Sequence, residues 1–154
     1  MQIDENITKR IYSDVKNVWL MQVATSTDSQ PWIANVFFVV DKKLNFYWLS
    51  LPNRRHSREL THNNNAAIAI AIKHDKPVIG VQAEGVVREV KSVALMSRIM
   101  PRYIKKYGAG QQFVSLVRKG ASQHRLYMFE PTSLQLFDEL NYTPEQNPVV
   151  LLFE

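Results

Sequence analysis

The chain has 154 residues, which is the usual length of one domain and enough to bury a sizeable core. Its 45% hydrophobic and 21% charged residues are typical of a globular protein, and its longest apolar runs are too short to span a membrane. The net charge of +5 permits anionic partners, whereas the lack of cysteine excludes disulfides, thiolate metal sites and cysteine nucleophiles. The opening segment MQIDENITKR lacks the apolar region of a signal peptide, so we expect a cytoplasmic protein.

The first third of the chain predicts one helix followed by three strands. Apolar residues recur at every fourth position of Ile3–Lys16, which favours a short amphipathic helix. Aromatic and β-branched residues then predict strands over Val18–Thr25, Trp32–Val40 and Leu44–Leu51. Short polar segments with typical turn residues join these strands, so we expect an antiparallel meander.

The second strand is apolar on both faces. One face carries Trp32, Ala34, Val36 and Phe38, and the other carries Ile33, Phe37 and Val39, interrupted only by Asn35. A strand buried on both sides needs cover over each face. We expect a barrel interior on one side and a helix, a second subunit or a flat ligand on the other.

Positive residues gather where the third strand ends. Pro52 breaks that strand, and Asn53 is a suitable N-cap for a following helix. Arg54, Arg55 and His56 would then fill the first helical turn, where a cation typically costs about 0.3–1 kcal/mol. A bound anion would offset that cost, and we favour a phosphate over the alternative of a solvated basic turn.

The next two predicted strands carry small or polar residues on one face. In Ala66–Lys73, isoleucines share one face and alanines the other, so another element can approach closely; a packed helix is favoured there over a ligand. In Val78–Val90, Gly85 indicates a bulge or a close backbone approach. Gln82 and Glu84 of the same strand would face either a ligand or water.

Helical spacing returns in the last third of the chain. It covers Ser92–Met100 and continues past Pro101, which breaks or restarts the helix, to a C-terminal stop at Gly108. A further short helix is expected over Gln111–Arg118.

Strand-forming segments close the chain. Leu126–Phe129 and Ser133–Phe137 predict a strand pair or one bent strand, with Pro131 at the break. The apolar tail at 149–153 is expected to dock on its own barrel or on a partner subunit.

Together these elements predict a single domain over residues 1–154, mainly β with helices (α+β), built as a small and mostly antiparallel barrel. The sequence has no G-x-S-x-G elbow, no P-loop and no H-E-x-x-H motif, and its histidines lack metal-ligand spacing. A chain without an evident nucleophile, metal site or acid–base pair can still do chemistry through a cofactor. A basic turn beside a strand buried on both faces suits a flat, phosphorylated ring system.

Three ordered segments carry a resemblance to a known family. They are W-I-A-N-V-F-F-V-V-D (Trp32–Asp41), N-F-Y-W-L-S-L-P-N-R-R-H-S-R-E-L (Asn45–Leu60) and V-Q-A-E-G-V-V-R-E-V (Val81–Val90). In this order they resemble the pyridoxamine 5'-phosphate oxidase-like, FMN-binding split barrels, and look closest to a small, poorly characterised branch. The resemblance covers roughly Val18–Val90 and implies an antiparallel split β-barrel of the FMN-binding type. It also implies a homodimer with FMN at the interface and a flavin-dependent oxidoreductase acting on an unknown small molecule.

The resemblance also implies the residues of the cofactor site. By match to the family pattern, Asn35, Val36 and Phe37 would line the flavin ring, largely through their backbone. The remaining matched positions lie toward the phosphate or on the fifth strand: Leu49, Ser50, Arg55, His56, Ser57 and Gln82.

Several positions depart from the oxidase itself. His56 replaces a lysine of the phosphate grip, and Ala34 stands where the oxidase has an arginine. The tryptophan and arginine that contact the oxidase's substrate have no counterpart after Asn141. We therefore do not expect pyridoxamine phosphate to be the substrate.

The sequence also allows ligands other than FMN. Some members of the family use a deazaflavin, and others handle haem, for which His124 or a tail residue would be the ligand. A basic barrel that binds single-stranded nucleic acid is a third alternative. Its phosphate contacts and stacking platforms would be Arg54, Arg55, Arg58, Lys105, Lys106, Trp32, Tyr47 and Trp48.

Overall fold

The computed structural model describes residues 5–108, 110, 115, 117, 119–120 and 122–153. Its elements in chain order are α1 (Glu5–Val15), β1 (Leu20–Thr27), β2 (Gln30–Val40), β3 (Phe46–Ser50), α2 (Arg55–His62), β4 (Asn65–Lys73), β5 (Ile79–Glu89), α3 (Val93–Tyr107), β6 (Arg125–Asp138) and β7 (Val149–Leu152). The further helix expected over Gln111–Arg118 lies outside the described residues, apart from Ser115 and Val117. None of the described helices is both long and apolar enough to cross a membrane.

The strands of the described chain form one antiparallel sheet that closes on itself. Their order is β3-β2-β1-β4-β5-β6-β7, and β3 also pairs with β6, so six strands make a barrel and β7 extends β6 outside it. The expected fold class, mainly β with helices in a split barrel, is confirmed.

Alternation of side chains along the strands fills the barrel. Inward residues such as Met21, Val23, Ile68 and Ile70 are almost completely buried, while the residues between them face outward. Large aromatic side chains, among them Trp48, supply much of the interior volume. Burial of these apolar surfaces is the main source of stability for the fold.

Strand β6 is continuous where the sequence left two alternatives. All of Arg125–Asp138 is one strand, and its register against β5 shifts next to Gly85, which pairs with Pro131. A Cβ atom on Gly85 would overlap the carbonyl oxygen of Glu130, so only glycine fits there. The bulge and close backbone approach expected at Gly85 are confirmed.

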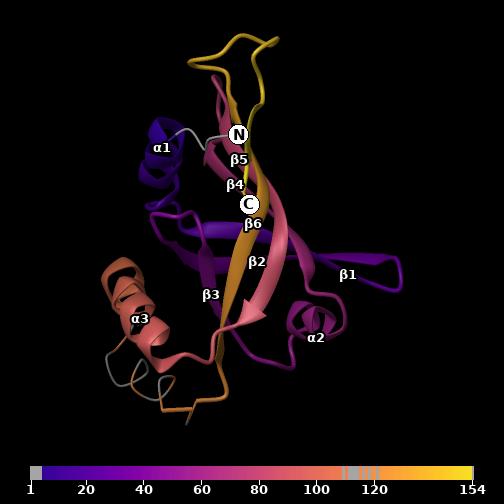
Figure 1. Cartoon of the computed structure of the whole chain (residues 1–154), viewed down its shortest axis with the longest axis vertical. Helices are drawn as coiled ribbons and strands as arrows, with labels where there is room; N and C mark the ends of the chain where they lie inside the picture. The colour runs from indigo at the N-terminus through magenta and orange to yellow at the C-terminus, as the bar shows by residue number, and fades with distance from the viewer. Residues whose placement is uncertain are drawn as a thin grey trace.

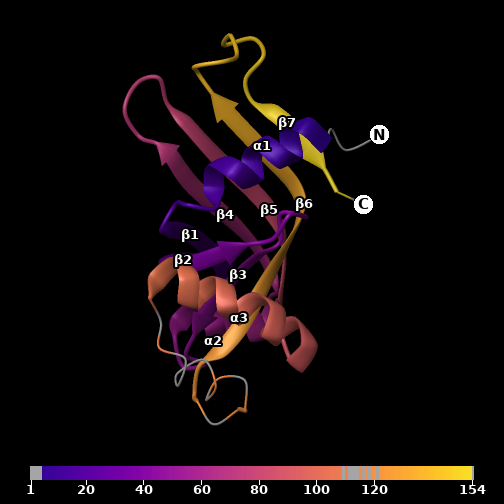
Figure 2. The same cartoon turned by 90° about the vertical axis from the view of Figure 1, so that its left-hand side faces the viewer.

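The helices lie at opposite ends of the barrel (Figures 1 and 2). α1 buries Ile11 and Val15 at one end, while α2 and α3 lie at the other. α3 is capped at its start by Ser92, whose side chain accepts a hydrogen bond from the Leu95 N–H, and at its end by Gly108 with φ of 67°. It runs through Pro101 without interruption, so the expectation that Pro101 breaks or restarts the helix is wrong.

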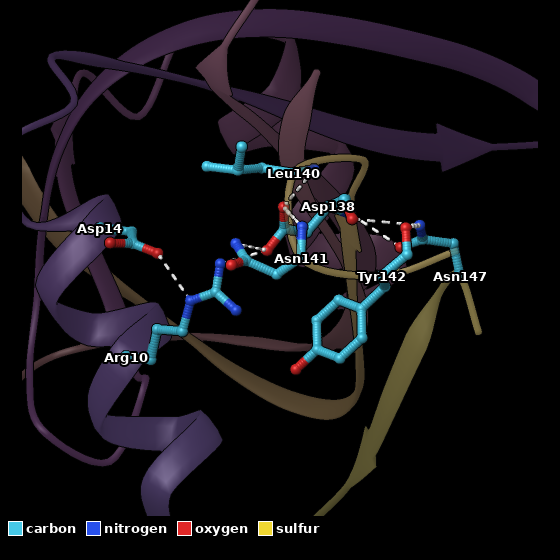
Figure 3. Close-up of polar contacts among 7 residues, drawn as sticks. All are labelled: Arg10, Asp14, Asp138, Leu140, Asn141, Tyr142 and Asn147. Atoms are coloured by element: carbon cyan, nitrogen blue, oxygen red, sulfur yellow. Dashed lines mark hydrogen bonds and ion pairs between the residues drawn. The ribbon is translucent and has the colours of Figure 1, made fainter. Parts of the chain in front are cut away.

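The buried carboxylate of Asp138 links α1 to β6 and to the loop that follows β6 (Figure 3). The oxygens of Asp138 accept hydrogen bonds from Arg10 of α1, from the Leu140 N–H and from both the N–H and side chain of Asn141. The Asn147 side chain binds the backbone of Asp138: its Oδ1 accepts from the Asp138 N–H at 2.8 Å, and its Nδ2 donates to the Asp138 carbonyl at 3.1 Å. Burial alone would raise the pKa of Asp138, but the hydrogen bonds from Arg10 and Asn141 hold it below the ordinary value.

One face of the sheet remains uncovered by the described chain. The alanine face of β4 packs against no helix; it forms part of a groove of about 400 Å³. Strand β2 is buried on both faces only at its end, over Phe38–Val40, because Ile33 and Phe37 are 60% and 53% exposed. The expectations of a helix over the alanines and of a wholly buried second strand are therefore corrected.

The apolar tail docks on its own sheet. β7 pairs antiparallel with β6, and Leu151 points into the core. Val150 and Leu152 alternate with it and face the uncovered side of the sheet. Of the two positions expected for the tail, the structure shows the one on its own barrel.

Candidate functional site

The barrel splits between β2 and β3. β2 pairs with β1 over Gln30–Phe37 but with β3 only over Phe38–Val40. The part of β2 before Phe38 therefore has no described strand along its β3 side. Backbone N–H and C=O groups on such an edge need other partners, such as a ligand.

Helix α2 begins beside this open edge. Its N-cap is Arg54, in extended conformation and without a side-chain capping bond, so the expected cap at Asn53 is wrong by one residue. The first turn contains Arg55, His56 and Ser57 and no acidic residue. A helix start that lacks both a capping side chain and an acid leaves its free N–H groups available to an external acceptor.

Arg55 is held in place from two sides. Its Nε donates to Glu59 Oε1 at 2.8 Å, and its guanidinium lies 4.3 Å from the centre of the Trp32 ring. Glu59 is itself fixed by Thr25, whose hydroxyl donates to Oε2 at 2.5 Å. Hydrogen bonds from Thr25 and Arg55 lower the pKa of Glu59, so the carboxylate is ionised. The Nη nitrogens of Arg55 have no partner among the described residues, which leaves one edge of the guanidinium free for an anion.

His56 lies inside a buried cluster of hydroxyl groups. Its Nε2 is 2.9 Å from Ser50 Oγ, and Ser57 Oγ donates to the same oxygen at 3.2 Å. Tyr127 of β6 is hydrogen-bonded to Ser57. Burial, together with the positive charge of Arg54, lowers the pKa of His56, so the imidazole is neutral near pH 7.

The other predicted residues lie on different surfaces. Asn35 and Phe37 point to the uncovered face, where Asn35 accepts a hydrogen bond from Gln22 at 2.9 Å. Gln82 lies on the same face, but β1 and β4 separate it from β2, a span of about 14 Å at the usual strand spacing. Val36 faces the barrel core, and Leu49 packs beneath α3.

The structure thus brings Ser50, His56 and Ser57 into contact, with Arg55 in the same helical turn. It does not bring Gln82 to them within one chain. Sequence reasoning missed Glu59, although its place four residues after Arg55 is the usual spacing of a helical ion pair. It also missed Tyr127, which reaches the site only because β6 pairs with β3.

Comparisons with known proteins agree with this architecture. A sequence profile described as pyridoxamine 5'-phosphate oxidase matches residues 7–138. Comparison with curated proteins finds no significant match.

Several solved structures share the fold at low sequence identity. General stress protein 26 from Bacillus anthracis is 12% identical, with a TM-score of 0.70 over 96% of this chain and 99% of that one. A haem binding protein from Mycobacterium smegmatis is 13% identical, with a TM-score of 0.75 over 99% of this chain and 59% of that one. The haem storage protein HutZ from Vibrio cholerae is 16% identical, with a TM-score of 0.59 over 85% of this chain and 91% of that one.

The matched profile covers most of the chain, including the split barrel and α2. These structural likenesses concern the fold alone. On the profile match, the chain belongs to the pyridoxamine 5'-phosphate oxidase family.

Proposed function

We propose that the protein binds FMN and acts as a flavin-dependent oxidoreductase on a small molecule, as a cytoplasmic homodimer. The observation that carries the proposal is the open edge of β2 beside a helix start that lacks both an acid and a capping side chain. The open edge of β2 suits a planar ring with hydrogen-bonding groups, and the start of α2 suits the phosphate attached to that ring.

The residues around the start of α2 fit a phosphate group. Arg55 offers its free Nη edge, and Glu59 and Trp32 restrict the conformations of its side chain. Ser50 and Ser57 add hydroxyl groups, and neutral His56 adds a hydrogen bond without a full charge. Arg55 would therefore supply most of the electrostatic attraction.

The residues along β2 fit the ring system. Asn35, Val36 and Phe37 would line it mainly through backbone groups, while Leu49 and Ser50 border the phosphate side. Gln82 would contact a flavin held by the second copy, since it lies on the uncovered face and some distance from Arg55 in its own chain. Bound FMN, or a deazaflavin in its place, would supply hydride transfer, while the chain binds and orients the cofactor.

The test is a titration of the purified protein with FMN, followed by absorbance and fluorescence. The wild type should bind FMN, and Arg55→Ala combined with His56→Ala should weaken binding at least a hundredfold, because the principal cation and a hydrogen bond are lost. Arg88→Ala combined with His62→Ala is the matched control, since it removes the same residue types from exposed positions. Equal FMN affinity in both double variants would contradict the phosphate assignment.

Haem is the second candidate, because two of the solved structures with this fold are described as binding or storing haem. Addition of haem to the purified protein would then give a Soret band, and His124→Ala would remove it. A Soret shift in the wild type together with no FMN binding would replace the flavin proposal.

A further inference from the structure

Four side chains of α3 reach across to the backbone of β2, and we refer to them together as the α3 clamp. They are Arg102, Tyr103, Lys106 and Tyr107. Their targets are the carbonyl groups of Phe37, Phe38 and Val40, in the stretch where β2 leaves β1 and joins β3.

Tyr107 takes the place of a neighbouring strand. The pairing with β1 ends where Leu20 lies opposite Phe37, so Phe38 has no strand partner on that side. The Tyr107 hydroxyl accepts from the Phe38 N–H at 3.0 Å and is 2.6 Å from its carbonyl oxygen. The hydroxyl is also 2.9 Å from the carbonyl oxygen of Trp19, the residue before β1, so Tyr107 bridges the two strands where they diverge.

Tyr103 lies at the fork between β2 and β3. Its hydroxyl is 3.0 Å from the carbonyl oxygen of Phe37 and 2.8 Å from that of Tyr47. The side chain is only 4% exposed, so water cannot easily replace this bridge. Tyr103 therefore fixes the point at which the two strands separate.

Lys106 and Arg102 complete the arrangement. Lys106 Nζ donates to the Phe38 carbonyl at 2.9 Å and lies 4.1 Å from the centre of the Phe38 ring. Arg102 donates to the Val40 carbonyl at 2.6 Å. Burial lowers the pKa of Lys106 to about 8, which shows that placing this ammonium against the strand has an energetic cost. Side-chain hydrogen bonds to so short a stretch, in addition to its pairing with β3, restrict its backbone.

We propose that the α3 clamp positions β2 for the flavin ring, with Tyr103 and Tyr107 as positioning residues. The clamped stretch begins at Phe37 and directly continues the open edge at Asn35 and Val36. A shift of the carbonyl groups at the fork would move the backbone that contacts the ring while leaving the phosphate end at α2 unchanged. This inference rests on the proposed function.

The experiment separates the ring from the phosphate by comparing FMN with riboflavin, which lacks the phosphate. Tyr103→Phe and Tyr107→Phe should each weaken both ligands by the same factor, about tenfold, because one buried hydrogen-bonded anchor is lost. Arg55→Ala combined with His56→Ala should weaken FMN and leave riboflavin unchanged. The visible circular dichroism of bound flavin, which reports ring surroundings, should change only in the tyrosine variants.

Asp138→Asn serves as the control for a general loss of stability, because Asp138 binds Arg10 of α1, and α1 lies at the opposite end of the barrel from α3 (Figure 1). It should leave flavin affinity and dichroism as in the wild type. If a tyrosine variant does not fold, Lys106→Met tests the same role of the α3 clamp, and it should weaken the binding of both FMN and riboflavin.

The outcomes distinguish the two proposals. A wild type that binds neither ligand overturns the proposed function and this inference with it. A wild type that binds both, with unchanged affinities in the clamp variants or equal losses in Asp138→Asn, overturns the inference alone.

Discussion

Two buried carboxylates, Asp138 and Glu59, lie near opposite ends of the molecule, and each is paired with an arginine. Asp138 binds Arg10 at the end where α1 lies, and Glu59 binds Arg55 beside the split in the barrel. A buried ion pair adds little net stability over an apolar pair, but loss of one partner is costly because the other charge remains. The two pairs therefore fix geometry at places where the chain must be held in one conformation.

Asp138→Asn is predicted to lower the free energy of unfolding by about 3 kcal/mol, because Arg10 then loses its buried partner. For a chain of this length, that corresponds to a fall in Tm of roughly 6–12 °C. Asp14→Asn is the control, since this more exposed carboxylate lies 3.6 Å from the same guanidinium and should change stability by less than about 0.5 kcal/mol. Similar losses in the two variants, measured by urea denaturation, would show that Asp138 has no special role.

The same carboxylate makes stability depend on pH. Its pKa is lowered in the folded state, so its contribution is present above the unfolded pKa of about 4 and is lost as the pH falls through the folded pKa. Urea denaturation at pH values from 7 down to 2 should accordingly show a shallower acid decline for Asp138→Asn than for the wild type.

At the scale of elements, β6 connects the parts of the fold. It pairs with β3 along its first residues, with β5 along most of its length, and with β7 near its end. The short β7 is useful to the fold because it covers the end of the core with Leu151.

Leu151→Ala is predicted to cost about 3 kcal/mol of unfolding free energy, because Leu151 is 5% exposed and its truncation leaves a cavity. Leu140→Ala, in the loop that follows β6, should cost less than about 0.5 kcal/mol, since Leu140 is 63% exposed. Equal midpoints for the two variants in urea would mean that β7 does not seal the core.

The strands could be predicted from the sequence because alternation of apolar residues is a local signal. The N-cap of α2 at Arg54 could not, because Asn53 is the residue type that favours the cap position, whereas Arg54 makes no side-chain capping bond. One bent strand through Pro131 was one of two alternatives that the sequence left open, and the choice between them depends on the bulge beside Gly85 on the neighbouring strand.

At the scale of the whole molecule, the uncovered face of the sheet has no partner within the described chain. It combines a groove with alanines and glutamines in its lining and exposed apolar residues on several strands. Those residues are Leu20, Ile33, Phe37, Val150 and Leu152. Exposed apolar surfaces of this kind are typical of faces that meet another protein. The sequence indicated that something covers the outer face of the second strand, but it could not distinguish a helix, a second subunit and a flat ligand.

The homodimer proposed above predicts that light scattering at micromolar concentration gives twice the mass of the chain. Ile33→Glu should shift the protein to monomers, because it places a charge on the exposed apolar face. Val93→Glu, a change of equal exposure on α3, should leave the dimer intact. A monomeric wild type would contradict the proposed homodimer. A dimeric Ile33→Glu variant would show that the dimer interface lies on another surface.

The site itself was predictable only in part. Ser50, Arg55 and His56 follow one another closely in the chain; Ser50 contacts His56, and Arg55 precedes His56 in the same helical turn. Thr25 of β1 and Tyr127 of β6 bind the neighbouring Glu59 and Ser57, and only the closed barrel brings these two strands to the site.

The pairing of β3 with β6 also has a consequence for the order in which the protein can be made. Phe46 pairs with Phe129, so the barrel stays open until the ribosome has delivered the last long strand. Until then β3 and β5 are both exposed edges of an incomplete sheet, and such edges readily associate with other chains. Between the synthesis of β5, which ends at Glu89, and that of β6, which begins at Arg125, the growing chain therefore exposes two unpaired strand edges.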